Sequence, residues 1–210
     1  MIRRYPSLQR DFFILASNKS MGLAFLKGSR MLKTIARASR YVIRRGVLFL
    51  VNLLAAPSDI MVIQTVRCSL MRIIGFKVGI DSQLSESLYV YDGRRFCAGE
   101  RCKLGSFCRI WDFSSIIVGS DLLASHGLTL ISGTHFLDDA RTSRPGPITI
   151  GNNVWIGINV TIVGPATIGD NVVIGANSLV LGRLERDGVY AGTPAKLIRK
   201  TPAKMEQEHI

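Results

Sequence analysis

The strongest constraint on the fold is a six-residue period in the second half of the chain. From residue 148 the sequence reads "ITIGNNVWIGINVTIVGPATIGDNVVIGANSLVLG", and one aliphatic side chain returns every six residues. These positions are Ile150, Ile156, Ile162, Ile168, Ile174 and Val180. Six matches neither the period of about 3.6 residues of a helix nor the alternation of an ordinary strand. It predicts a short strand and a tight turn, repeated, with one inward side chain per unit.

A weaker copy of the same register precedes this region. Three groups of three positions are spaced by six residues, and eight residues separate one group from the next. The groups are Val78, Leu84 and Val90; Ala98, Leu104 and Ile110; and Val118, Ala124 and Leu130. Three units make one turn of a triangular prism of parallel strands, with two extra residues at one corner of each early coil. Stacked coils would bury a continuous aliphatic column. A β-sandwich is the alternative, but it does not explain so regular a period.

An interruption of the register marks a candidate site. Between Leu130 and Ile150 the chain carries "SGTH" and "DDARTSRPGP", which predicts a loop over 131–147 that leaves the prism. The loop contains His135, one of only three histidines. A solvated loop histidine is the alternative to a chemical role.

Four motifs occur in a fixed order: "SGTH", "ITIGNNVWIGINVTI", "VVIGANSLV" and "AGTPAKLIRK". With them, roughly residues 75–200 resemble the hexapeptide-repeat acyltransferases, in the branch that includes galactoside, maltose and nodulation-factor O-acetyltransferases. The resemblance implies a mainly β fold, a left-handed parallel β-helix over 78–200. The handedness follows from the resemblance and not from the spacing.

The same resemblance implies a homotrimer that binds acetyl-CoA as co-substrate in a cleft between neighbouring prisms, with no metal requirement. It makes His135 the general base that deprotonates the acceptor hydroxyl, which attacks the thioester directly. An imidazole with an ordinary pKa of about 6.5 suits that task near neutral pH. His126, at an outward-facing repeat position, is the competing candidate.

For the co-substrate, the resemblance places Trp155, Ile158 and Ala176 along the pantetheine cleft and Arg199 near the nucleotide phosphates. After Val180 the chain reads "LGRLERDG" where relatives carry a Thr-Lys phosphate contact. Arg183 is therefore expected to supply that charge, with Arg186 as the alternative. Ordinary surface charge is an equally open interpretation of both arginines.

For the acceptor, the resemblance aligns Asp112, in "RIWDF", with an acidic stretch that contacts sugar hydroxyls in relatives. Asp138 or Asp139 would orient His135 or bind the acceptor, although carboxylates in such loops are more often only solvated.

Charge separates the N-terminal part from the rest. Residues 1–78 hold 14 basic and two acidic side chains, a net charge of +12, whereas residues 79–210 hold 13 of each sign. The extension over 1–77 lacks the hexapeptide register and predicts basic amphipathic helices. Two interpretations stay open: contact with an anionic inner membrane over 19–50, and a helical cap on the prism over 58–74. A short helix or tail is expected over 201–210.

Several classes are disfavoured by the same residues. The continuous apolar run of about 11 residues is shorter than the roughly 20 that span a bilayer. Aromatic residues do not interleave with the basic ones, so no nucleic-acid partner is expected. The four cysteines lack zinc-site spacing. We see no cleavable signal peptide, and expect a cytoplasmic protein, either free or peripheral on the inner membrane.

The sequence therefore predicts an acetyl-CoA-dependent O-acetyltransferase. Its acceptor would be a sugar or a lipid-linked precursor of a bacterial capsule, O-antigen or exopolysaccharide. A small-molecule acetyltransferase of the same fold, acting on an antibiotic or on serine, is the first alternative. A prism that serves only as a scaffold is the second. A metal-dependent relative would stack three histidines, and only His126 and His135 are available in the prism.

Overall fold

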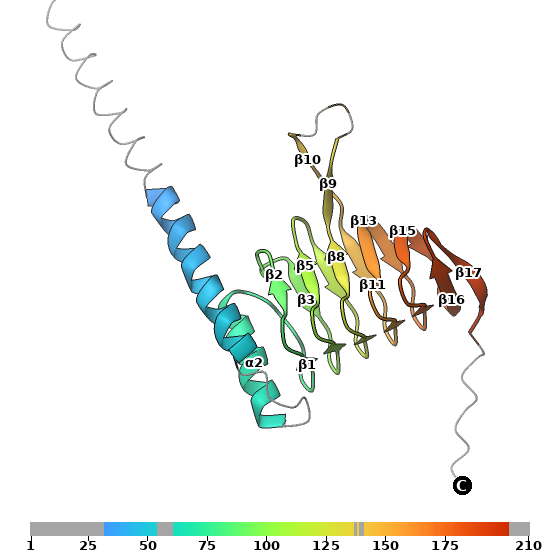
Figure 1. The fold of residues 1–210 in the computed structure, drawn as a ribbon, viewed down its shortest axis with the longest axis horizontal. Helices are drawn as coiled ribbons and strands as arrows, with labels where there is room; N and C mark the ends of the chain where they lie inside the picture. The colour runs from blue at the N-terminus through green and yellow to red at the C-terminus, as the bar shows by residue number, and fades with distance from the viewer. Residues whose placement is uncertain (1–31, 54–60, 137, 139–140, 202–210) are drawn as a thin grey trace, which may run out of the picture. The chain divides into compact units, whose positions relative to one another are not determined.

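The computed structural model describes residues 32–53, 61–136, 138 and 141–201. The chain divides into two compact units, Met1–Ile43 and Arg44–Ile210. Within the first unit, residues 32–43 are helical. The second unit holds the rest of that helix, 44–53, together with a second helix and all the strands. Its strands wind into stacked coils with three faces (Figure 1).

Each face is a ladder of short parallel strands. The first face contains β1 (Gln83–Leu84), β4 (Lys103–Leu104), β7 (Leu123–Ala124), β12 (Trp155–Ile156), β14 (Val173–Ile174) and β16 (Gly188–Gly192). The second contains β2 (Tyr89–Val90), β5 (Arg109–Trp111), β8 (Thr129–Ile131) and the first halves of β13 (Thr161–Ile168) and β15 (Leu179–Leu184). The third contains β3 (Phe96–Ala98), β6 (Ile116–Val118), β11 (Ile148–Ile150) and the second halves of β13 and β15.

The register reproduces the coil lengths expected from the sequence. On the first face Gln83 pairs with Lys103 and Lys103 with Leu123, so each early coil takes 20 residues. Trp155 then pairs with Val173, so the later coil takes 18. Between them Leu123 pairs with Trp155, 32 residues on, because the loop that contains His135 is inserted there.

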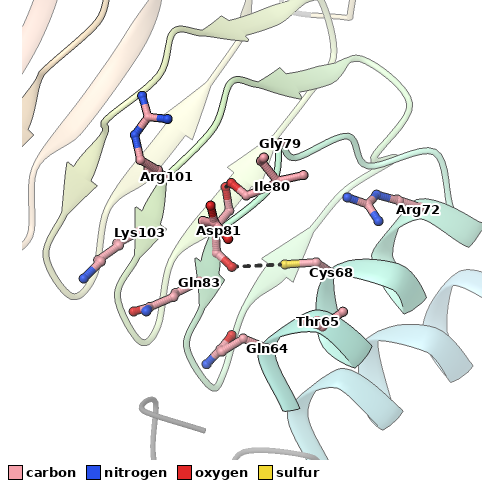
Figure 2. A pocket seen from close by; sticks show the side chains of 11 residues that line it. Gln64, Thr65, Cys68, Arg72, Gly79, Ile80, Asp81, Gln83, Arg101 and Lys103 are labelled. Carbon is pink, nitrogen blue, oxygen red and sulfur yellow. Dashed lines mark hydrogen bonds between the residues drawn. The ribbon is translucent and has the colours of Figure 1, made fainter. Parts of the chain in front are cut away.

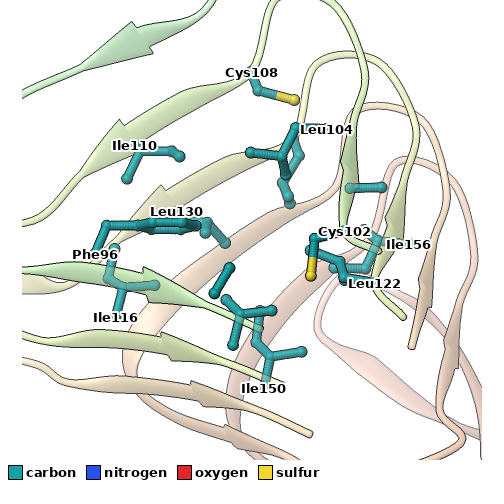
Figure 3. Packing of buried hydrophobic residues seen from close by; sticks show 14 of the residues in the cluster. Phe96, Cys102, Leu104, Cys108, Ile110, Ile116, Leu122, Leu130, Ile150 and Ile156 are labelled. Carbon is teal, nitrogen blue, oxygen red and sulfur yellow. The ribbon is translucent and has the colours of Figure 1, made fainter. Parts of the chain in front are cut away.

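The core is the predicted aliphatic column. All fifteen positions of the six-residue register, from Val78 to Val180, are buried. Their side chains point into the coils, where they pack in one continuous cluster (Figure 3). Each fully buried Val, Leu or Ile contributes about 1.5–3 kcal/mol relative to an exposed one. Several residues that lie four positions after a register residue are buried as well, including Cys102 and Cys108 in the early coils.

The corners explain why asparagine recurs in the repeats. Among the described residues, ten that are not glycine adopt positive φ. Four of them, in the later coils, are asparagines, which tolerate this conformation better than most residues. At one corner they also form a ladder. Asn153 Nδ2 donates to Asn171 Oδ1 at 2.8 Å, and Asn171 Nδ2 donates to Asp187 Oδ1 at 2.8 Å. The amides thus link three successive coils.

Helix α2 (Met61–Ile73) packs against the outermost strand of the first face, β1. The backbone amide of Leu84 donates to Gln64 Oε1 at 3.0 Å, and Arg67 Nη2 donates to the carbonyl of Ser85 at 2.5 Å. Cys68 and Met71 are buried in the same core. An unpaired edge strand can pair with another chain, and the open end of a solenoid exposes its hydrophobic column. Helix α2 covers both.

At the other end of the first face, β17 (Ala195–Lys200) pairs antiparallel with β16. This strand is not predicted by the six-residue period of the sequence. Of the helix or tail expected over 201–210, residues 202–210 lie outside the described residues. No helix in the described ranges is long and apolar enough to cross a membrane.

Candidate functional site

The interruption of the register forms a β-hairpin at the corner between the second and third faces. Strand β9 (Gly133–His135) pairs antiparallel with β10 (Ser143–Pro145), and His135 lies opposite Ser143. The hairpin projects away from the coils (Figure 1). His135 is thereby carried on a defined strand, with its side chain exposed.

The base of the hairpin is anchored by Ser132, which is fully buried. Its hydroxyl accepts a hydrogen bond from the amide of Ser114 and donates to the carbonyl of the same residue, both at 2.8 Å. The next residue, Gly133, leaves little room for a side chain, because a Cβ there would come within 3.1 Å of Phe113 Cβ and Phe113 would have to shift. The "SG" that precedes "TH" therefore fixes where the histidine strand leaves the coil.

A cavity of about 400 Å³ lies beside the histidine, within the size range of small-ligand sites. Its polar groups are His135, Thr134, Ser143 and Arg144, and its apolar wall comes from both the hairpin and the second face. Arg144 also stacks on Phe136, with its guanidinium carbon 5.9 Å from the ring centroid. The lining residues are Phe113, Ile131, Gly133, Thr134, His135, Ser143, Arg144, Pro145 and Val163.

The histidine is accessible to a ligand. His135 is exposed and lines the cavity, so a ligand in the cavity can reach its side chain. Asp138 is exposed in the turn of the hairpin, and Asp139 lies outside the described residues. An orienting role for Asp138 therefore stays a prediction.

Asp112 serves the fold in this structure. It is fully buried, and its carboxylate accepts hydrogen bonds from the backbone amides of Asp92 and Gly93, both at 2.8 Å, and of Arg95 at 3.2 Å. Burial raises the pKa of the Asp112 carboxyl above its ordinary value, although these amides oppose the shift. A carboxylate without exposed area does not reach an acceptor here, so the acceptor contact expected for Asp112 gains no support.

His126 lies at a different corner, between the first and second faces. Its Nδ1 accepts a hydrogen bond from the amide of Ser106 at 3.0 Å. The hydroxyl of Ser106 donates to Glu86, and this bond is the main reason that the pKa of the Glu86 carboxyl is lowered. His126 is thus engaged in a network that joins three coils.

The residues expected to contact the co-substrate are exposed, but they do not lie around His135. Trp155 is on the first face and is 53% exposed, and Ile158 and Ala176 stand at the corner between the first and second faces. His135 is carried by the corner between the second and third faces. A single chain therefore splits the predicted site between two corners.

The two predicted phosphate contacts are also exposed. Arg183, in the second half of β15, donates to Glu185 at 2.6 Å, whereas Arg199 lies in β17 opposite Val189. Arg183 is therefore ion-paired in the single chain. Neither arginine lines the cavity beside His135.

A second cavity, of about 520 Å³, lies between α2 and the first coil (Figure 2). It is lined by Gln64 and Cys68 on the helix and by Asp81 and Lys103 on the coil, among others, and by none of the predicted site residues. Within the described ranges, no group of three or more His, Cys, Asp or Glu side chains is placed to hold a metal ion.

An aromatic cluster on the second face was not expected from the sequence. Tyr91, Trp111 and Phe113 contact one another, and Phe113 lines the cavity beside His135. The signal was present as "YVYD" and "RIWDF", 20 residues apart, which puts their aromatic residues on adjacent coils.

Comparison with known proteins agrees with this architecture. The family model described as bacterial transferase hexapeptide (six repeats) matches residues 147–182. A Dictyostelium discoideum protein named as an acetyltransferase is 38% identical over 127 residues, which are 59% of this chain and 67% of that protein. WbbJ of Escherichia coli strain K12, named as a lipopolysaccharide biosynthesis O-acetyl transferase, is 31% identical over 114 residues, 48% of this chain. The match spans 58% of WbbJ, less than two thirds of its length.

Solved structures show the same fold. A hexapeptide-repeat acetyltransferase of Vibrio cholerae O1 biovar eltor, complexed with acetyl coenzyme A, superimposes with a TM-score of 0.65 at 25% identity. The match covers 76% of this chain and 87% of that one. A galactoside acetyltransferase in complex with coenzyme A gives a TM-score of 0.62 at 28% identity, with 78% and 81% covered.

Proposed function

The chain belongs to the hexapeptide-repeat acetyltransferase family, and from this premise we propose that it transfers the acetyl group of acetyl-CoA to a sugar hydroxyl. One observation supports this most directly. The exposed His135 stands on a hairpin anchored by buried contacts, next to a cavity large enough for a sugar unit.

The chemistry follows from the imidazole. The hydroxyl oxygen of the acceptor attacks the thioester carbonyl while His135 takes the hydroxyl proton. Collapse of the tetrahedral intermediate breaks the carbon–sulfur bond, and the departing thiolate regains the proton from the imidazolium. The products are an acetyl ester and free coenzyme A. Holding the hydroxyl beside the thioester removes most of the entropic cost of this bimolecular step.

We further propose that two chains build each site. Trp155, Ile158 and Ala176 occupy a different corner from His135, so the thioester would reach the histidine of a neighbouring prism. A closed homotrimer repeats this arrangement three times. In it, Arg199 and Arg183 are the proposed contacts of the nucleotide phosphates, for which guanidinium groups are suited.

The proposed acceptor is a sugar of a bacterial surface polysaccharide, free or linked to a lipid carrier. The likeness to WbbJ, named as a lipopolysaccharide biosynthesis O-acetyl transferase, supports this class. The helix over 32–43 also supports a function at the membrane surface. It exposes Leu32, Ile35 and Val42 beside Arg37 and Arg40, a mixture typical of helices that lie on anionic bilayers. We therefore propose a cytoplasmic protein that contacts the inner membrane peripherally.

The test is transfer of radiolabelled acetyl from acetyl-CoA to a panel of acceptors. The panel contains monosaccharides, oligosaccharides, a polysaccharide extract, serine and a macrolide. We expect alkali-labile label on a saccharide, as an ester requires, and loss of most of that label with His135→Ala. Labelling of serine or of the macrolide alone would instead favour the small-molecule alternative.

A further inference from the structure

A row of aromatic side chains lies on the outside of the second face. The ring centroids of Tyr91 and Phe113 are 4.6 Å apart, those of Tyr91 and Trp111 are 5.9 Å apart, and those of Trp111 and Phe113 are 6.0 Å apart. Tyr89 joins the row, 5.0 Å from Trp111. Tyr91 and Phe113 stay 37% and 43% exposed, so the row presents an aromatic surface to solvent.

The row is held in place from the side of the N-terminal helix. The guanidinium carbon of Arg45 lies 5.5 Å from the ring centroid of Tyr89, and that of Arg44 lies 5.8 Å from the ring centroid of Tyr91. Both arginines belong to the same compact unit as the rings. Such contacts fix the rings before any ligand arrives, so little conformational entropy is lost on binding.

The row leads directly into the cavity beside His135. Trp111 is the register partner of Ile131, and Ile131 is the partner of Val163. Ile131 and Val163 both line that cavity, as does Phe113 from the aromatic row itself. Aromatic surface and histidine cavity therefore form one continuous strip along the second face.

We propose that Tyr91, Trp111 and Phe113 form an acceptor platform, on which an oligosaccharide lies with one sugar in the cavity of His135 and its next units on the rings. This inference rests on the proposed function and narrows its substrate class to chains of two or more sugars.

The chemistry of the strip matches this occupant. Sugar rings carry apolar C–H faces and polar rims, and rigid, amphipathic tyrosine and tryptophan side chains provide contact surface for both at a low entropic cost. The rim of the platform is polar and charged, since Asp92 is ion-paired with Arg94 at 2.6 Å and with Arg95 at 3.3 Å beside the rings. An oligosaccharide can hydrogen-bond this rim, whereas a lipid tail cannot.

The first experiment measures kcat/KM for acceptors of increasing length, with maltose-series and chitin-series saccharides of one to four units as probes. In the wild-type protein we expect kcat/KM to rise with length. In Trp111→Ala we expect the ratio between tetrasaccharide and monosaccharide to fall about five- to tenfold, which corresponds to one lost aromatic contact. Trp111→Phe should restore most of the ratio. Tyr91→Ala, at the exposed edge of the row, tests the same point with less risk to folding.

The matched control is Ile117→Ala, which removes an exposed apolar side chain from the third face and should leave the ratio unchanged. A wild-type rate that does not depend on length, or an equal loss for short and long acceptors in Trp111→Ala, would overturn the platform.

A second experiment separates the platform from the proposed reaction. The chain has two tryptophans, so Trp155→Phe leaves Trp111 as the fluorescent reporter. In that background we expect a saturable change of emission when the tetrasaccharides are titrated, with acetyl-CoA absent. Binding without any acetyl transfer would refute the proposed function and keep the platform. A Trp111 signal that responds only to lipid vesicles, or only to protein concentration, would instead assign the surface to a membrane or to a second copy, and would refute the platform.

Discussion

The carboxylate of Asp112 accepts a 2.8 Å hydrogen bond from the backbone amide of Gly93, one coil earlier in the prism. It also accepts from the amides of Asp92 and Arg95. We therefore expect Asp112→Ala to destabilise the protein by about 2–4 kcal/mol, because it leaves buried donors unpaired. Asp112→Asn should cost less, since its amide oxygen still accepts. Urea denaturation followed by circular dichroism measures both.

Asp138→Ala is the control for this prediction, because Asp138 is exposed in the hairpin turn and should change stability by less than about 0.5 kcal/mol. If Asp112→Ala unfolds at the wild-type urea concentration but loses turnover, the residue serves the acceptor after all, as the sequence suggested.

Local periodicity explains why the fold was predictable from the sequence. Each coil repeats the same inward positions, so the spacing alone predicts that Ile150 and Val180 are buried, without knowledge of distant contacts. The early coils were also predicted, including the two extra residues per turn. Those extra residues lie at the corner that Asp112 caps, and this task is invisible in a single sequence because its partners are backbone amides 17 to 20 residues away.

The site was predictable only in part for a related reason. His135 was identifiable because its loop interrupts the six-residue period. Whether its side chain meets Trp155 depends on the proposed contact between neighbouring chains, which the sequence of one chain does not contain. The aromatic platform escaped notice because its rings face outward, at positions where the repeat imposes no residue type. Strand β17 also followed no repeat, since it pairs antiparallel beyond the last coil.

Thiol reactivity should be confined to Cys97, the exposed member of the four cysteines. Burial raises the pKa of the Cys68 and Cys102 thiols, and that of Cys108 to about 11. A raised thiol pKa keeps the sulfur protonated at pH 8, and the thiolate is the reactive form. With Ellman's reagent at pH 8 we expect one equivalent in the native protein and four in guanidinium chloride.

Cys97→Ser should reduce the native value to zero without changing the unfolding midpoint. A second thiol that reacts as fast as Cys97 in the folded protein would contradict the burial of these side chains in the prism.

Membrane contact should depend on the basic residues of the first unit. The double variant Arg37→Glu and Arg40→Glu reverses two exposed charges in the helix over 32–43. Because each basic side chain near an anionic surface contributes about 1 kcal/mol, we expect at least about a tenfold loss of binding to phosphatidylglycerol vesicles in a sedimentation assay. Binding by the wild-type protein should also weaken at high salt.

Lys103→Glu combined with Lys200→Glu reverses two exposed charges on the prism and serves as the matched control. Equal losses in the two double variants would mean that net charge, and not this helix, attracts the protein to the vesicles.

Sharing of the site between chains predicts complementation of inactive variants. His135→Ala removes the proposed base, and Ala176→Trp fills the proposed cleft from an exposed position. Each variant alone should have little activity. In every trimer that contains both chains, about a third of the sites, one in each trimer, join an intact His135 from one chain to an intact Ala176 from its neighbour. Two affinity tags isolate the mixed trimers, and we expect about that fraction of wild-type turnover.

Mixed trimers that form in the expected proportions but stay inactive would refute the shared site. Inactive mixed trimers of His135→Ala with Trp155→Ala, in place of Ala176→Trp, would likewise show that the first face of a neighbouring chain does not contribute to the site. A wild-type protein that is monomeric in light scattering and yet active would refute it without any variant.

The role of His135 has the most direct test. His135→Ala removes the proposed proton acceptor from an exposed strand position, so the core, the hairpin anchor at Ser132 and the assembly should survive. General-base catalysis contributes about 10²–10⁴-fold, and we expect turnover to fall by that factor while acetyl-CoA affinity changes little. Thiol release measures the first quantity, and calorimetry the second.

His126→Ala distinguishes this role from a general need for imidazole. His126 Nδ1 accepts a hydrogen bond from the Ser106 amide, so His126→Ala should lower the unfolding midpoint and change the turnover little. The two histidine variants are therefore expected to show opposite patterns, with the rate lost in one and stability in the other. If His135→Ala keeps wild-type turnover under conditions where the chemical step is rate-limiting, His135 is an ordinary loop residue, and the base must be sought elsewhere around the cavity.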